Sequence, residues 1–78
     1  MKNYYNDLNK IIALAAIANA AEEAYSTNPE SEAAERAFDE AYKAEFSAVE
    51  SLAAELAPEL GGMKIARATI RKYVANNS

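Results

Sequence analysis

The fold is decided by residues 33–57, which read AAERAFDEAYKAEFSAVESLAAELA. Alanines recur in this stretch at alternating intervals of three and four residues, at positions 34, 37, 41, 44 and 48. A second stripe, mostly of larger side chains, recurs at similar intervals: Tyr42, Phe46, Val49, Ala53 and Leu56. At about 100° per residue, the two stripes span roughly 200° of a helix, which is more than one neighbouring helix covers. We therefore expect a long helix that packs against two others.

Residues that break helices divide the rest of the chain. Glycine occurs only at Gly61 and Gly62, and proline only at Pro29 and Pro58. No stretch alternates with a period of two, so no strand is expected. The breaks predict three helices, over about residues 4–26, 29–57 and 63–76.

The helix starts are predicted from capping residues. Asn3 is a candidate cap for the first helix, and Asn28 for the second, with Pro29 at its first position. The predicted fold class is all-α: a long antiparallel helical hairpin plus a shorter third helix, a three-helix bundle. We expect one domain over residues 1–78, and we expect it to dimerise, because so small a chain builds only a small core.

The composition excludes several kinds of chemistry. The chain has 78 residues, a net charge of −4, and no cysteine, histidine or tryptophan. A disulfide scaffold, a zinc finger and a thiol catalyst are therefore excluded, and the side chain that most often transfers protons near neutral pH is missing. No glycine-rich phosphate loop and no calcium loop occurs. We expect no enzymatic activity, no cofactor and no metal.

The apolar run from Ile11 to Ala18 decides the expected location. Eight residues are too few to span a membrane. Asp7 interrupts the basic segment that a secretory signal would need before such a run. We therefore expect a cytoplasmic protein with no membrane contact.

Alanine dominates the apolar residues. Hydrophobic residues make up 51% of the chain, and 19 of them are alanine. When the hairpin turn is placed at Asn28 and Pro29, four alanine pairs fall into register across it. Small side chains allow two helices to approach closely, so we expect a seam of alanines between them. The pairs are Ala24 with Ala33, Ala20 with Ala37, Ala16 with Ala41, and Ala13 with Ala44.

The third helix is too short to cover the whole hairpin. Its 14 or so residues reach about 21 Å, and we expect it to cover the half that holds Leu8, Ile11, Val49 and Leu56. Large apolar residues nearer the turn then remain bare, which is typical of an interface. The alternative is that the third helix crosses the hairpin obliquely and covers these residues. Glu45 lies among them, where it either anchors the interface or reaches water or an arginine of the third helix. The candidate interface residues are Ile17, Tyr25, Phe38, Tyr42 and Glu45.

Charge is unevenly distributed. Residues 22–62 carry eleven acids against two bases, whereas residues 63–78 carry four bases and no acid. The two segments can simply attract each other within one fold, or each can meet a charged partner. The acidic face is either solvated or occupies a basic nucleic-acid groove on a target protein. Its members are Glu32, Glu35, Asp39, Glu40 and Glu50.

A short motif in the basic segment gives an alternative function. Residues 66–73, Ala-Arg-Ala-Thr-Ile-Arg-Lys-Tyr, resemble the recognition helix of helix-turn-helix regulators and transposases. The resemblance implies a small DNA-binding regulator in which Arg67, Thr69, Arg71 and Lys72 face DNA.

The preferred hypothesis is a non-enzymatic protein–protein interaction module. It would dock on a larger protein, on a second copy of itself, or on both. Small, acidic, cysteine-free chains of this kind are similar in size and composition to phage or plasmid inhibitors, including anti-CRISPR and anti-restriction proteins. A DNA-binding regulator and a purely structural homo-oligomer are the alternatives.

Overall fold

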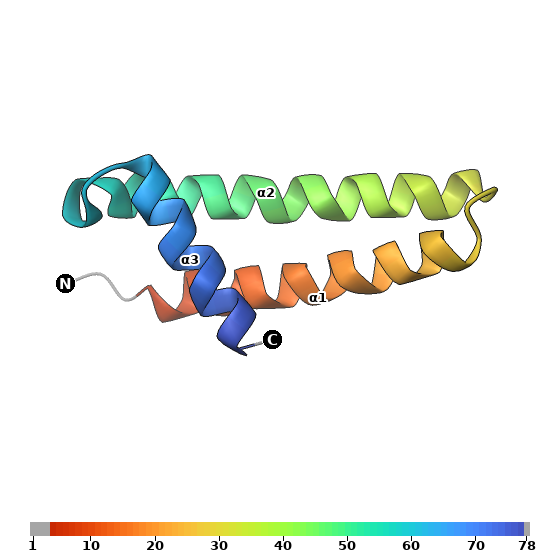
Figure 1. Ribbon diagram of the computed structural model, residues 1–78, viewed down its shortest axis with the longest axis horizontal. Helices are drawn as coiled ribbons and strands as arrows, with labels where there is room; N and C mark the ends of the chain where they lie inside the picture. The colour runs from red at the N-terminus through yellow and green to blue at the C-terminus, as the bar shows by residue number, and fades with distance from the viewer. Residues whose placement is uncertain (1–3, 78) are drawn as a thin grey trace.

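The computed structural model describes residues 4–77, which form three α-helices and, within that range, no strand (Figure 1). The helices are α1 (Tyr5–Thr27), α2 (Glu32–Leu60) and α3 (Met63–Asn77). α1 and α2 form an antiparallel hairpin, and α3 crosses both at the end away from their turn. The prediction of an all-helical chain with three helices is therefore confirmed. Asn3, the predicted cap of the first helix, lies outside the described residues.

The turn between α1 and α2 differs from the prediction. The N–H of Asn28 donates to the carbonyl of Ala24 at 3.1 Å and ends α1, while the carbonyl of Asn28 accepts from the N–H of Ser31 at 3.1 Å. Ser31 is the cap of α2, because its Oγ accepts from the N–H of Ala34 at 3.1 Å. The prediction that Asn28 caps this helix, with Pro29 at its first position, is wrong. Residues 29 and 30 form a turn and α2 begins only at Glu32, so the residue in position to cap it is Ser31.

The end of α2 also extends beyond its predicted limit. The helix continues through Pro58 to Leu60, although proline supplies no N–H to the preceding turn. Two amides then close the helix on one acceptor, since the N–H groups of Gly61 and Gly62 donate to the carbonyl of Ala57 at 3.0 and 2.9 Å. Gly61 has φ +95°, a left-handed conformation that glycine adopts without strain. α3 can therefore turn back across the hairpin.

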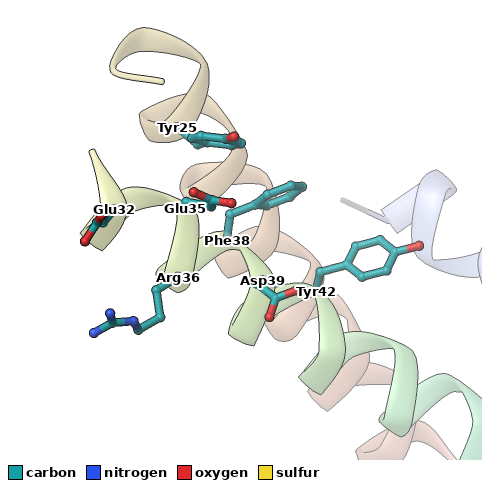
Figure 2. A pocket seen from close by; sticks show the side chains of 7 residues that line it. All are labelled: Tyr25, Glu32, Glu35, Arg36, Phe38, Asp39 and Tyr42. Carbon is teal, nitrogen blue, oxygen red and sulfur yellow. The ribbon is translucent and has the colours of Figure 1, made fainter. Parts of the chain in front are cut away.

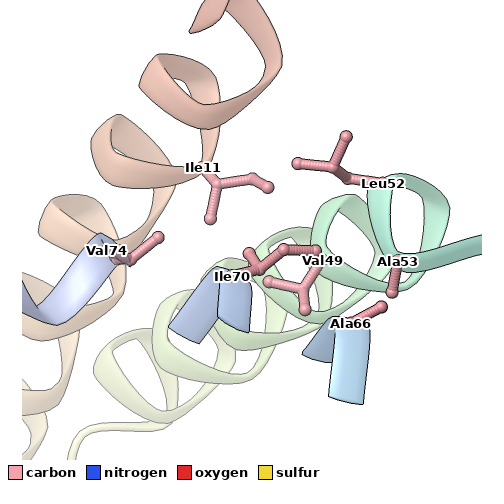
Figure 3. Close-up of a cluster of buried hydrophobic side chains, with 8 residues drawn as sticks. Ile11, Val49, Leu52, Ala53, Ala66, Ile70 and Val74 are labelled. Carbon is pink, nitrogen blue, oxygen red and sulfur yellow. The ribbon is translucent and has the colours of Figure 1, made fainter. Parts of the chain in front are cut away.

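The core lies in the half of the hairpin that α3 covers (Figure 3). Helix α3 contributes Ala66, Ile70 and Val74, which are 0, 1 and 8% exposed and recur every four residues. Leu8 and Leu56 pack against this cluster, so α3 covers the half predicted from its length. The core cluster consists of Ile11, Ala15, Val49, Leu52, Ala53, Ala66, Ile70 and Val74.

The predicted alanine seam is wrong. Of its eight members, seven are exposed, and only Ala41 is half-buried. The hairpin instead buries a mixed set of residues, the small Ala15 and Ala18 and the larger Ile11 and Leu52. Burial is worth about 0.8 kcal/mol per methylene, so helices rotate to bury large side chains before small ones. Three alanines of α2, Ala34, Ala41 and Ala48, are half-buried, and Ala48 packs against the core.

Candidate functional site

An open groove of about 750 Å³ lies at the turn end of the hairpin, beyond the reach of α3 (Figure 2). Tyr25, in the last turns of α1, forms one side of the groove, and α2 supplies the remaining lining residues. We call this surface the turn-end groove. It is lined by Tyr25, Glu32, Glu35, Arg36, Phe38, Asp39 and Tyr42.

Three aromatic rings form a ladder along this groove. The ring of Tyr25 lies 5.9 Å from that of Phe38, between centroids and at 30°, and Phe38 lies 6.3 Å from Tyr42 at 59°. Tilted pairs at such distances contribute about 0.5–1.5 kcal/mol each. The ladder therefore helps to close α1 on α2 where the core is absent. It remains open on one side, because Tyr42 is 55% exposed.

The other two predicted interface residues lie outside this groove. Ile17 is 57% exposed and does not line it. Glu45 is half-buried and lines a second cavity of about 250 Å³, together with Asn19 of α1 and Arg71 of α3. Within residues 4–77 Glu45 has no hydrogen bond or ion pair, and none of its oxygens is buried without a partner. Its carboxylate therefore reaches solvent, which agrees with the alternative of a solvated side chain.

The predicted acidic face is divided by the fold. Glu32, Glu35 and Asp39 line the turn-end groove. Glu40 is exposed but does not line it. Glu50 does not line the groove either, and it bonds Arg67 of α3 instead. The groove therefore combines three of the five predicted acids with three aromatic rings, and Arg36 is the one basic residue among its lining residues, while Lys43 pairs with Asp39 from beside the groove.

The contact between Glu50 and Arg67 joins α2 to α3 through two hydrogen bonds. Arg67 Nε donates to Oε1 of Glu50 at 2.5 Å, and Arg67 Nη2 donates to Oε2 at 2.9 Å. These bonds hold the pKa of the Glu50 carboxyl below its ordinary value, and the nearby charge of Arg71 acts in the same direction. A second carboxylate, Asp39, pairs with Lys43 at 2.9 Å and raises the pKa of that lysine.

The four residues predicted to face DNA do not share one surface. Arg67 is bonded to Glu50, and Arg71 faces the cavity that contains Glu45. Thr69 donates its hydroxyl to the carbonyl of Ile65 at 2.8 Å, and it lies with Lys72 on the outer side of α3. The fold therefore places two of the four residues toward the hairpin and two away from it.

Three large hydrophobic residues that the structure leaves exposed, Tyr5, Phe46 and Ile65, were not among the predicted site residues. Phe46 is 47% exposed and lies one helical turn beyond Tyr42, on the second stripe that the sequence displays. Ile65 is 52% exposed on the outer side of α3. The stripe would have identified Phe46 as a neighbour of the ladder, whereas the position of Ile65 depends on how α3 packs.

In residues 4–77 no three carboxylates gather closely enough to hold a metal ion, and no helix has the length and apolar character to cross a membrane. The chain was also compared with known proteins. No protein-family model matches it, and neither a curated protein nor a solved structure is similar enough to match.

Proposed function

We propose that this protein is a non-enzymatic interaction module that docks on a larger protein through the turn-end groove. The observation that carries the proposal is the aromatic ladder of Tyr25, Phe38 and Tyr42, which lies outside the core and is open to solvent at Tyr42. Aromatic side chains that are rigidly held but accessible are typical anchors of protein interfaces.

The charge around the ladder supports a basic partner surface. Glu32, Glu35 and Asp39 lie beside the rings, so a partner would bury aromatic anchors at the centre and meet carboxylates at the rim. An inhibitor of a nucleic-acid-binding protein would have this character, because its acids would occupy a groove made for phosphates. We therefore retain the phage- or plasmid-type inhibitor as the specific form of the proposal, with Glu32, Glu35 and Asp39 as its rim.

The charges of the groove and the pairing of Arg67 give less support to the two alternatives, a structural homo-oligomer and a DNA-binding regulator. Two copies that met groove to groove would bring six carboxylates together against two arginines and the two lysines that pair with Asp39, and this excess of like charge opposes a symmetric dimer. A DNA-binding regulator would need Arg67 free, whereas this arginine makes two hydrogen bonds with Glu50.

Site-specific photo-crosslinking tests the proposal. Benzoylphenylalanine replaces Tyr42 in one variant and Tyr5, which is 64% exposed at the far end of the hairpin, in the control. In the cells that produce the protein, we expect irradiation to join the first variant to one larger protein, and the additional change Phe38→Asp to abolish that product. The control variant should not give the product.

Three results would overturn the proposal. The first is no product from position 42, the second is the same products from both positions, and the third is a product that contains only this chain. The third result would identify a structural homo-oligomer instead.

A further inference from the structure

We propose that the turn-end groove binds a basic amphipathic helix of the partner protein, docked in line with α3 on the same face of the hairpin. This inference rests on the proposed docking function and specifies the chemistry of the partner. It follows from a pattern that α2 carries at two places on one face, of which α3 covers only one.

The repeated pattern consists of an apolar residue, a carboxylate directly after it, and a second apolar residue three positions after the carboxylate. It starts at positions 34, 38, 44 and 49 of α2. Two of these copies face the same way: Phe38 with Asp39 and Tyr42, and residues 49, 50 and 53, where the sequence has Val, Glu and Ala. The two copies are separated by 11 residues, which turn a helix by about 1,100°, within about 20° of three full turns. They therefore share one face of α2, about 16 Å apart along its axis.

The second copy of the pattern shows what this face binds. Ala66 and Ile70 of α3 are 0 and 1% exposed and pack beside Val49 and Ala53 in the core (Figure 3). Arg67, the residue that follows Ala66, donates two hydrogen bonds to the carboxylate of this copy of the pattern, Glu50. α3 is thus a basic helix whose apolar residues recur every four positions and whose arginine meets the acid of α2.

The first copy of the pattern has the same elements and no helix over it. Figure 2 shows Tyr42 pointing toward the side of the hairpin on which the last turns of α3 lie. Asp39 is 59% exposed, and its present partner Lys43 is 73% exposed. Exposed pairs of this kind add little stability, so an arginine or lysine of a docking helix can replace Lys43 at small cost. Glu35 lies in the same groove and would meet a second cation.

A peptide with the sequence of residues 63–77 has the proposed chemistry and serves as the probe. A cross-link between positions 65 and 69, on the outer side of α3, keeps the peptide helical and leaves its apolar face free. Binding of the labelled peptide to the full chain is measured by fluorescence anisotropy. We expect saturable binding that weakens by at least about tenfold in Phe38→Ala and in Asp39→Lys.

Matched variants separate the groove from general charge effects. Glu40→Lys makes the same charge change as Asp39→Lys at the next position, but Glu40 does not line the groove, so binding should persist in this variant. A peptide that carries Arg67→Glu should bind the wild-type chain at least about tenfold more weakly. Circular dichroism should show that every protein variant keeps the helical content of the wild-type chain.

Each other outcome rejects the inference. No binding by the peptide, or binding that Phe38→Ala and Asp39→Lys leave unchanged, shows that the groove does not take a basic helix. Sedimentation that shows self-association of the wild-type chain, lost in Phe38→Ala, identifies a second copy as the occupant instead. Crosslinking from Tyr42 to a larger protein would still support the docking function if the peptide failed, so the two proposals fail separately.

Discussion

Two isoleucines of α3 allow a direct test of where the stability of this protein resides. Ile70 is 1% exposed and touches the cluster to which all three helices contribute, whereas Ile65 is 52% exposed on the outer side of the same helix. We expect Ile70→Ala to destabilise the protein far more than Ile65→Ala. The chemical change and the helix are the same, so the difference reports burial alone.

The expected magnitude follows from the burial of each side chain. Removing three carbon atoms from a buried site costs about 0.8 kcal/mol for each, and the cavity left behind brings the total for Ile70→Ala to about 3–4 kcal/mol. At position 65 about half of that transfer term is lost, and the better helix propensity of alanine offsets part of it, so the cost should stay below about 1 kcal/mol. A chain of this length has a free energy of unfolding of about 4–12 kcal/mol.

Urea unfolding followed by circular dichroism measures both variants. The midpoint should fall strongly for Ile70→Ala at an unchanged slope, and only slightly for Ile65→Ala. Two equal shifts would refute the assignment of the core to the crossing of α3. So would a larger effect at position 65, because the outer side of α3 would then have to be buried.

The remaining predictions concern a cap, a turn and an ion pair. Ser31→Ala should destabilise the protein by about 1 kcal/mol, and Asn28→Ala should cost less because its side chain does not cap α2; thermal unfolding compares the two. Gly61→Ala should cost about 1–2 kcal/mol at φ +95°, again measured by thermal unfolding, and a stabilised variant would contradict the left-handed turn. The pKa of Glu50 is lower in the folded chain than the ordinary value of 4.5, so its pairing with Arg67 stabilises the fold above that value and is lost as the pH falls through the lowered pKa. Between about pH 6 and about pH 3, the urea midpoint should therefore fall less in Arg67→Gln than in the wild type. An equal fall in both proteins would show that the pairing of Glu50 with Arg67 does not contribute to the pH dependence.

The helices were predictable from the sequence because glycine and proline occur at few positions. Gly61 and Gly62 end α2, and α3 after them crosses the far half of the hairpin (Figure 1). The cap of α2 was harder to predict because Asn28 and Ser31 both lie near its start. Only the hydrogen bonds of the turn decide between them, and those depend on how α1 ends.

The rotation of the helices about their own axes was not predictable. In an alanine-rich hairpin, several registers bring small residues together, and matching Ala16 to Ala41 gave no information about where the large residues prefer to lie. The structure leaves Ala16 exposed and buries Ile11 and Leu52 instead. Alanine spacing alone therefore indicates a helix pair without fixing its facing sides.

The candidate site was predictable in part. Tyr42 followed from the apolar stripe, and Phe38 lies one helical turn before it. Their convergence with Tyr25 and with the acids of the groove depends on the hairpin contact between two helices. The pairing of Glu50 with Arg67 likewise joins residues from separate helices, which spacing along one helix does not reveal.

The residues that hold the fold together and the residues that line the turn-end groove are two separate sets. The eight members of the core cluster and the seven lining residues have none in common. Substitutions in the groove therefore leave the main source of stability intact, and selection can change the binding specificity without losing the fold. In descendants of this chain we expect the turn end to diverge quickly while Ile11, Val49 and Ile70 stay apolar, as in a scaffold with one variable end.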